Sequence, residues 1–344
     1  SQATRLVQTS EIPPQTPLQA TAQFHASPPD FSDVRGQESA KRALVIAATG
    51  NHNALLWGPP GSGKTLLARR LPGILPLLSG EERLEATRIH SVAGLLEPGA
   101  GLLQHRPFRS PHHSSSMVSL VGGGSVPRPG EVSLAHHGVL FLDEVAEFPR
   151  SVLESLRQPL EDGEVCISRA QMAVRFPCRT LVVAAMNPCP CGYLGARLRR
   201  CTCSETEISR YRSRLSGPLL DRFDLHLEIP SILPEDLEDL QASSQNSCDL
   251  AEQAETARTF SRKRQGDLPN SRLGGAQLRE ICGLRSGSKQ FLIQAARRLG
   301  LSARAHDRTL RVARTIADLD QAPIVEELHL AEALSYRNAS PTTT

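Results

Sequence analysis

The sequence of 344 residues has no run of eighteen or more apolar residues, which argues against helices that span a membrane. Its first residues, SQATRLVQTSEIPPQTP, lack both a basic start followed by an apolar core and a small-residue cleavage site. We therefore expect a cytoplasmic protein with no membrane partner. With 39% hydrophobic and 22% charged residues, the composition is typical of a globular protein and excludes disorder of the whole chain.

The net charge of the chain is small, and aromatic residues make up only 4% of it. The formal net charge is only +3, so binding to nucleic acid has to be argued from local clusters of arginine. Eight cysteines are present, but half of them fall within residues 187–203, and a chain of this size does not need disulfides to fold. A reducing compartment fits this distribution. The first residue is Ser rather than Met, which indicates that a preceding segment was removed.

Three regions follow one another along the chain. Residues 1–30 are rich in Pro, Gln, Thr and Ala without a period and are interpreted as a linker or disordered arm. In residues 31–232, apolar runs at 53–57, 138–144 and 179–187 alternate with helical stretches, which predicts an α/β core with a doubly wound, mostly parallel sheet. Residues 233–338 predict a small all-helical domain, in which Gly300 ends one helix and Ser302 caps the next, and 339–344 a flexible tail.

The motif GPPGSGKT directly follows the apolar run at 53–57 and fits the P-loop pattern. Glycines allow backbone N–H groups to surround phosphates, while the helix that follows presents its positive end. Lys64 is expected to neutralise the β- and γ-phosphate oxygens, and Thr65 to ligate Mg²⁺. The predicted cofactors are ATP and Mg²⁺, with these binding residues: Gly58, Pro59, Pro60, Gly61, Ser62, Gly63, Lys64 and Thr65.

Further polar residues stand where the other apolar runs end. Asp143 and Glu144 follow GVLFL, where Asp143 is predicted to hold Mg²⁺ and Glu144 to polarise the attacking water. Asn187 ends the next run and is expected to orient that water. Arg222 and Arg304 are candidates for stabilising charge on the transferred phosphoryl group, and for each the alternative is an ion pair with a neighbouring Asp.

Several motifs together resemble the AAA+ ATPases of the magnesium-chelatase-like group: DVRGQESAKRAL, GPPGSGKT, RPFRSPHHSSS, PGEVSLAHHGVLFLDE, AAMNPCPCG and SGPLLDRFDLH. The resemblance covers about residues 31–338. It implies Walker A residues Lys64 and Thr65, Walker B residues Asp143 and Glu144, and a hexameric ring. Members of the group carry an additional N-terminal domain resembling part of the Lon protease fold, and the chain is expected to be a fragment that begins in the linker after this domain. The remaining implied roles are sensor 1 for Asn187, a trans-acting arginine finger for Arg222 and sensor 2 for Arg304.

Candidate DNA contacts lie in a predicted hairpin and in the cysteine-rich segment. The stretch 152–183 is expected to begin as an amphipathic helix through Leu153, Leu156 and Leu160, followed by two strands around the turn SRAQ. A second candidate contact is an insertion within residues 105–131, in which Gly122–Gly124 are expected to form a flexible loop tip. The other candidate contacts are clusters of arginine. For these clusters, the alternative to DNA binding is a solvated face or a subunit interface. The arginines proposed to contact DNA are Arg169, Arg197, Arg199 and Arg200, with further clusters at Arg210, Arg212 and Arg214 and at 262–264.

The cysteine-rich segment contains two C-x-C pairs, Cys189 with Cys191 and Cys201 with Cys203, and Gly192 and Gly195 between them permit a reversal. Two such pairs can form a tetrahedral structural zinc site, and free thiols are the alternative. Four thiolates leave no open position for catalysis. The pairs His112/His113 and His136/His137 are expected to pack or form hydrogen bonds, because adjacent side chains should diverge too far to share an ion.

The resemblance implies an ATP-driven DNA helicase or branch-migration motor that supports integration of single-stranded DNA during natural transformation and homologous recombination. Its expected partners are single-stranded and branched DNA, five further copies of the chain and recombination proteins. The alternative is a chelatase-type motor subunit that remodels a protein partner for Mg²⁺ insertion into a porphyrin. A third is a general protein remodeller, which the 4% aromatic content disfavours, because its substrate loops more often present an aromatic residue.

Overall fold

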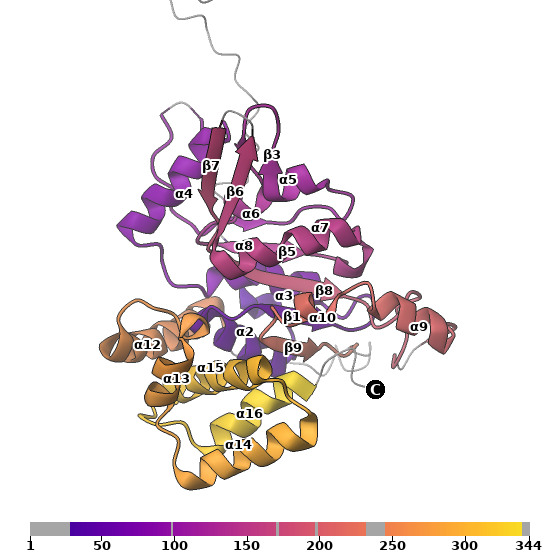
Figure 1. Ribbon diagram of the computed structural model, residues 1–344, viewed down its shortest axis with the longest axis vertical. Helices are drawn as coiled ribbons and strands as arrows, with labels where there is room; N and C mark the ends of the chain where they lie inside the picture. The colour runs from indigo at the N-terminus through magenta and orange to yellow at the C-terminus, as the bar shows by residue number, and fades with distance from the viewer. Residues whose placement is uncertain (1–27, 98, 170–171, 197–198, 232–244, 339–344) are drawn as a thin grey trace, which may run out of the picture.

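The computed structural model describes residues 28–97, 99–169, 172–196, 199–231 and 245–338 (Figure 1). Most of the predicted N-terminal arm, the predicted tail at 339–344 and the expected boundary at residue 232 lie outside these ranges. Within them, no helix combines the length and apolarity needed to cross a bilayer.

A five-stranded sheet in the order β2-β5-β8-β1-β9 forms the centre of the molecule. All four neighbouring pairs are parallel, as is expected when helices connect consecutive strands. This confirms the predicted α/β fold with a mostly parallel sheet. The predicted apolar runs become β1 (Ala54–Trp57), β5 (Val139–Leu142) and β8 (Leu181–Met186), while the two edge strands are β2 (Phe108–Arg109) and β9 (Leu225–Glu228).

Both faces of the sheet are buried, and alternate residues of β8 show this most clearly. Val182, Ala184 and Met186 pack into the cluster beneath one face. Leu181, Val183 and Ala185 pack into the cluster beneath the other face. A strand covered on both sides has to be apolar at every position, which explains the continuous run LVVAAM.

Helices of the core lie on both faces of this sheet. The segment preceding β1 forms η2 (Phe31–Asp33) and α2 (Glu38–Gly50), and α2 packs against one face of the sheet, where it contacts β9. The expected amphipathic helix is broken into two at Leu156, because Pro159 has no N–H to donate to Ser155. The other core helices are α3 (Lys64–Arg70), η3 (Leu71–Gly73), α4 (Gly80–Val92), α5 (Met117–Val121), α6 (Glu131–Leu134), η4 (Val145–Glu147), α7 (Arg150–Ser155), α8 (Arg157–Asp162), α9 (Glu205–Arg212) and α10 (Gly217–Leu220).

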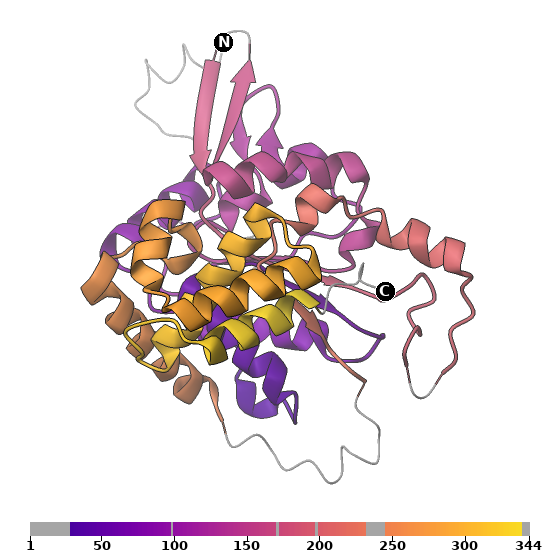
Figure 2. The same ribbon diagram turned by 60° about the horizontal axis from the view of Figure 1, so that its bottom comes forward.

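Two hairpins extend the core. The predicted hairpin is formed by β6 (Glu164–Arg169) and β7 (Met172–Pro177), which pair antiparallel and project from the body in Figure 2. Near the predicted insertion, β3 (Gly122–Gly123) pairs with β4 (Arg128–Pro129). Gly122 and Gly123 are therefore strand residues rather than a loop tip. A Cβ at Gly122 would come within 2.6 Å of the carbonyl oxygen of Arg128, so this close approach requires glycine.

The chain ends in a helical domain that packs below the sheet in Figure 1. Helix α15 is buried on all sides from Val312 to Asp318, and Ser302 caps it by accepting the N–H of Ala305, as the sequence predicted. It packs against both α2 and α16. The elements of this domain are α12 (Ser247–Gln265), η5 (Asn270–Arg272), α13 (Gly275–Cys282), α14 (Ser286–Leu299), α15 (Ala303–Leu319) and α16 (Glu327–Asn338).

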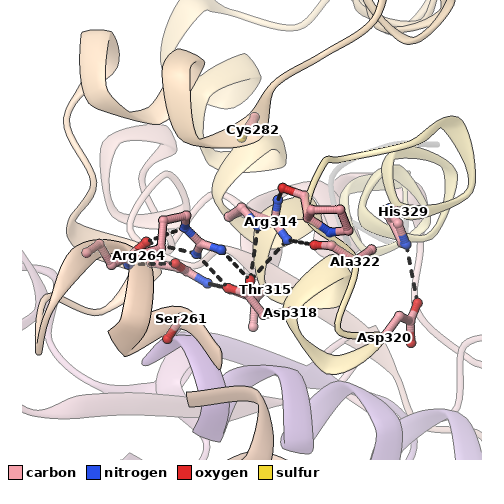
Figure 3. Close-up of polar contacts among 12 residues, drawn as sticks. Ser261, Arg264, Cys282, Arg314, Thr315, Asp318, Asp320, Ala322 and His329 are labelled. Carbon is pink, nitrogen blue, oxygen red and sulfur yellow. Dashed lines mark hydrogen bonds and ion pairs between the residues drawn. The ribbon is translucent and has the colours of Figure 1, made fainter. Parts of the chain in front are cut away.

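A buried ion cluster joins three of these elements (Figure 3). Asp318 of α15 is fully buried and accepts hydrogen bonds from both terminal nitrogens of Arg264 at 2.8 and 3.0 Å. Arg314, also fully buried, lies 3.0 Å from the same carboxylate, and Asn270 donates to it at 2.7 Å. Asp318 thereby holds α12, η5 and α15 together. Arg264 is committed to this structural contact rather than presented to an external polyanion.

Candidate functional site

The P-loop lies at the carboxyl end of β1, between Trp57 and the start of α3 at Lys64. Gly61 and Gly63 have φ angles of 76° and 92°, which only glycine adopts without strain. A Cβ at Gly58 would come within 2.1 Å of the carbonyl oxygen of Ile229. The loop therefore depends on glycine for backbone shape and for its close approach to the chain after β9.

Lys64 points back into this loop. Its ammonium group donates to the carbonyl oxygens of Gly58 and Pro59 at 2.7 and 2.8 Å, and to Oδ1 of Asn187 at 3.3 Å. Burial lowers the pKa of Lys64 to about 8, although the negative charges of Asp143 and Glu144 oppose this shift. A phosphate anion would supply the missing negative charge at this buried cation.

Two hydroxyl groups show that the site fits a nucleotide and its metal. The Oγ of Ser62 is buried and has no hydrogen-bond partner among the described residues, as expected for a group that binds a ligand. Thr65 donates to Oδ2 of Asp143 at 2.8 Å, so the two predicted Mg²⁺ ligands are already adjacent. Oxygen ligands of this kind suit Mg²⁺.

Glu144 follows Asp143 in a left-handed backbone conformation with φ of 49°. Its N–H donates to Oδ1 of Asp143 at 3.0 Å, which supports this unusual turn. His113 places Nδ1 3.3 Å from Oε2 of Glu144, a contact that the sequence did not predict. The His112/His113 pair was the only signal, and nothing in its spacing related it to Glu144.

The remaining predicted catalytic residues do not all lie at the same end of the parallel strands. Asn187 follows β8 and reaches Lys64, so it lies beside the P-loop. Arg222 precedes β9 and therefore lies at the amino ends of the strands, away from the P-loop. It forms an ion pair with Glu161 rather than with a neighbouring Asp. Arg304 is exposed near the start of α15 and forms no ion pair with any described residue. The roles of Arg222 and Arg304 stay predictions.

Residues of the helical domain hold the segment that contains Arg222. Arg308 of α15 is buried with its guanidinium 3.7 Å from the carboxylates of both Asp221 and Asp224. His52 bridges Asp224 at 3.0 Å and Thr315 of α15 at 2.7 Å. A continuous polar chain therefore connects the Arg222 segment to the buried cluster around Asp318.

The four cysteines of the cysteine-rich segment converge. The Sγ atoms of Cys189, Cys191 and Cys201 lie 3.4 to 3.7 Å apart, and all four sulfurs, including that of Cys203, lie within 4.8 Å of one another. A tetrahedral ion with Zn–S bonds of about 2.3 Å requires sulfurs about 3.8 Å apart. Backbone N–H groups of Tyr193 and Thr202 lower the pKa of Cys191 to about 5, which favours its thiolate, whereas burial raises the pKa of Cys189 to about 12 and favours its thiol. The donor set and spacing fit zinc.

The cysteine-rich segment also touches the P-loop. Gly192 has φ of 83°, and a Cβ there would lie 2.7 Å from Cγ of Pro60. Arg199 stacks over the ring of Tyr193 at 4.4 Å and donates to its hydroxyl at 3.1 Å, while Arg200 is exposed. Arg197 and the side chain of Arg169 lie outside the described part of the chain.

Most arginines of the other clusters form contacts within the protein. Arg210 and Arg212 lie on helix α9, so the extended geometry that would align them with Arg214 is not formed. Arg214 pairs with Glu147 at 2.7 Å, and Arg262 pairs with Glu255 at 2.8 Å.

The expectation that adjacent histidines diverge is wrong for His136 and His137. Their rings are 3.8 Å apart and both Nε2 atoms face Oε2 of Glu85, because His137 adopts a left-handed backbone with φ of 58°. Nδ1 of His136 accepts the N–H of Arg179, so its Nε2 carries the proton and donates to Glu85. Burial lowers the pKa of His136 to about 4. Hydrogen bonding is thus the role of this pair, as the sequence predicted.

Comparison with known proteins agrees with this geometry. The family model for magnesium chelatase, subunit ChlI, matches residues 30–237, and the model for the ChlI C-terminal region matches 244–337. The chain is 49% identical to an uncharacterized protein, YifB, of Escherichia coli over 90% of its length, and 48% identical to competence protein ComM of Haemophilus influenzae over 90%. Each alignment covers 60% of the relative, so the chain spans about three fifths of their length.

More distant similarity extends to the chelatases themselves. The chain is 25% identical to the magnesium-chelatase 38 kDa subunit of Cereibacter sphaeroides, over 60% of each protein. The motifs, the parallel sheet with its P-loop and the helical C-terminal domain all agree with these matches. The chain belongs to the magnesium chelatase ChlI family, and within it is similar to the competence protein ComM.

Proposed function

We propose that this chain is the motor part of an ATP-driven DNA helicase that migrates branches while single-stranded DNA is integrated in natural transformation and homologous recombination. The observation that carries the proposal is the 48% identity to a competence protein over 90% of the chain. The P-loop and its acidic partners supply the expected machinery for ATP. The proposed assembly is a cytoplasmic hexameric ring, which acts on single-stranded and branched DNA together with recombination proteins.

ATP binding would exchange the contacts of Lys64. Its ammonium group would leave the carbonyl oxygens of Gly58 and Pro59 for the β- and γ-phosphates, and Ser62 would gain a partner. This exchange frees Asn187, which then orients the attacking water. Thr65 and Asp143 would hold Mg²⁺, which would neutralise charge on the phosphate oxygens.

Hydrolysis would use Glu144 as the base. Its carboxylate is half exposed and contacts only His113 among described basic side chains, so it is accessible to water. Arg222 would act in trans on the nucleotide of the next subunit, because it lies at the edge of the sheet opposite its own P-loop. For this, Arg222 must leave Glu161. Arg304 is proposed to contact nucleotide from the helical domain.

A structural zinc bound by Cys189, Cys191, Cys201 and Cys203 would brace the segment after Asn187. Because Gly192 contacts Pro60, the brace connects the P-loop to Arg199 and Arg200. These exposed arginines, with Arg197 and Arg169, are the proposed contacts to the DNA backbone. Tyr193 beneath Arg199 adds an aromatic surface on which a base can stack.

The test is a branched-DNA assay with purified protein. DNA-stimulated ATPase activity and branch migration are expected for the chain, and both should be lost in the Lys64→Ala variant. Arg199→Ala/Arg200→Ala should weaken DNA binding at all sequences and reduce its salt dependence. A ring-forming protein with no DNA-stimulated ATPase activity, indistinguishable from Lys64→Ala, would refute the helicase proposal.

The second candidate is a chelatase-type motor subunit that remodels a partner for Mg²⁺ insertion into a porphyrin. The matches to both ChlI family models favour this candidate. The identity of 25% to a chelatase subunit supports it less strongly. This candidate predicts ATPase activity that responds to a partner protein and not to DNA. Measuring ATP hydrolysis with forked DNA and with single-stranded DNA therefore separates the two.

A further inference from the structure

A cavity of about 370 Å³ lies between the core and the helical domain. On the core side, Gly138 and Arg179 stand just before β5 and β8. On the other side, Arg258 belongs to α12 and Arg272 to η5. The cavity thus opens at the edge where the strands begin. The P-loop is at the other end of β1, so a four-residue strand, about 13 Å long, separates the two sites.

The lining of this cavity is rich in unpaired positive charge. Its two carboxylates are already engaged: Glu82 pairs with Arg106 at 3.2 Å, and Asp267 pairs with Arg262 at 3.1 Å. Among described residues, no carboxylate lies within ion-pair distance of three further arginines of the lining. These are Arg179, Arg258 and Arg272.

The arginines also lie close enough to oppose one another. Burial lowers the pKa of Arg258 to about 10, and the charges of Arg106 and Arg262 add to the shift. Burial and then the charge of Arg179 lower the pKa of Arg272. Gly163 allows the side chains of Arg179 and Arg272 to approach each other, because it has no side chain. Its φ is 72°, and a Cβ there would lie 3.0 Å from Nη2 of Arg272 and 3.3 Å from Cγ of Arg179.

We propose that this cavity is a second phosphate-binding site, which takes two linked phosphate groups as found in inorganic pyrophosphate or in a nucleoside diphosphate. A guanidinium fork matches phosphate oxygens in pairs, and three such groups without an internal partner suit a ligand with about three negative charges. A ligand here bridges Arg179 of the core to Arg258 and Arg272 of the helical domain. The site is independent of DNA binding and of the P-loop.

The test is isothermal titration of the Lys64→Ala variant with inorganic pyrophosphate, since this variant lacks the P-loop cation. One binding site is expected, with affinity that falls as salt is raised. In the Arg179→Gln/Arg272→Gln double variant on the same background, affinity should fall at least tenfold. Neither arginine forms an ion pair among the described residues, so the melting temperature should change little. The matched control is Arg175→Gln, an exposed arginine of the hairpin outside the cavity, which should bind as before.

Titration with ADP and AMP identifies the source of the phosphates. Binding of ADP as tight as pyrophosphate supports a nucleotide ligand, and binding of pyrophosphate alone supports the free anion. The absence of pyrophosphate binding to Lys64→Ala refutes the proposal. Binding that persists unchanged in the double variant refutes it equally, because the anion is then held elsewhere.

Discussion

Replacing Asp318 with alanine should destabilise the helical domain more than any exposed ion pair would. Asp318 is fully buried and is shared by Arg264, Arg314 and Asn270. The substitution removes the only carboxylate that faces Arg314 in this cluster, while the guanidinium stays fully buried. Arg264 is partly exposed, with 21% of its side-chain surface accessible, and can recover hydration.

The expected loss is dominated by Arg314. Removing one partner of a buried ion pair costs about 3–5 kcal/mol, because the other charge is left without compensation. Carbonyl oxygens of Ala322 and Pro323 still accept from Arg314, so we expect a value near the middle, about 4 kcal/mol. With a urea slope of about 2 kcal/mol per M, the unfolding midpoint should fall by about 2 M.

Urea denaturation followed by circular dichroism at 222 nm measures this loss, because the domain is helical. The control is Arg262→Ala, which removes exposed ion pairs to Glu255 and Asp267 and should cost no more than about 1 kcal/mol. If Asp318→Ala lowers the free energy of unfolding by less than the control does, the cluster is not the main restraint on α12, η5 and α15.

Three further outcomes are expected. Burial lowers the pKa of Lys64 to about 8 and bound phosphate should raise it, so ATP binding should take up a proton above pH 8. Calorimetry should show a constant affinity for ATP at pH 6–7 and a loss of affinity that approaches tenfold per pH unit above pH 8. An affinity that stays constant up to pH 10 would contradict this reasoning. Glu144→Gln should lower kcat by about 10²–10⁴-fold, whereas His113→Ala, which only positions Glu144, should lower kcat roughly two- to tenfold with KM for ATP unchanged. Protein purified without chelator should contain one zinc per chain, reduced in Cys201→Ser and retained in the exposed Cys248→Ser; metal content well below one per chain in the unaltered protein would be inconsistent with the Cys₄ site.

The parts of the fold that could be predicted are those governed by local chemistry. A parallel strand buried on both faces has to be apolar throughout, so LVVAAM indicated β8 without further context. The P-loop motif carries its own backbone requirements at Gly61 and Gly63. The break at Leu156 was also available from the sequence, since Pro159 removes a helix hydrogen bond, but the spacing of the leucines outweighed that signal in the prediction.

Contacts between distant segments could not be predicted in this way. His113 and Glu144 are thirty-one positions apart, and only the packing of the sheet edge brings them to 3.3 Å. The contact of the cysteine-rich segment with Pro60 depends on the backbone conformation of Gly192, which the local sequence does not show. Arg264 had the appearance of a surface charge, because nothing in the local sequence shows that Asp318 is buried opposite it.

The placement of Arg222 and the P-loop at opposite edges of one parallel sheet has a consequence for symmetry. β1 and β9 run side by side in the same direction, so the residue that precedes β9 and the loop that follows β1 face opposite ways. A twofold dimer pairs each P-loop with the other copy's Arg222 only if both lie within one self-complementary patch. A head-to-tail contact needs no such patch, because it joins two different surfaces of the chain. Repeated head-to-tail contacts give the assembly a polarity, and it then either closes into a ring or continues as a helix.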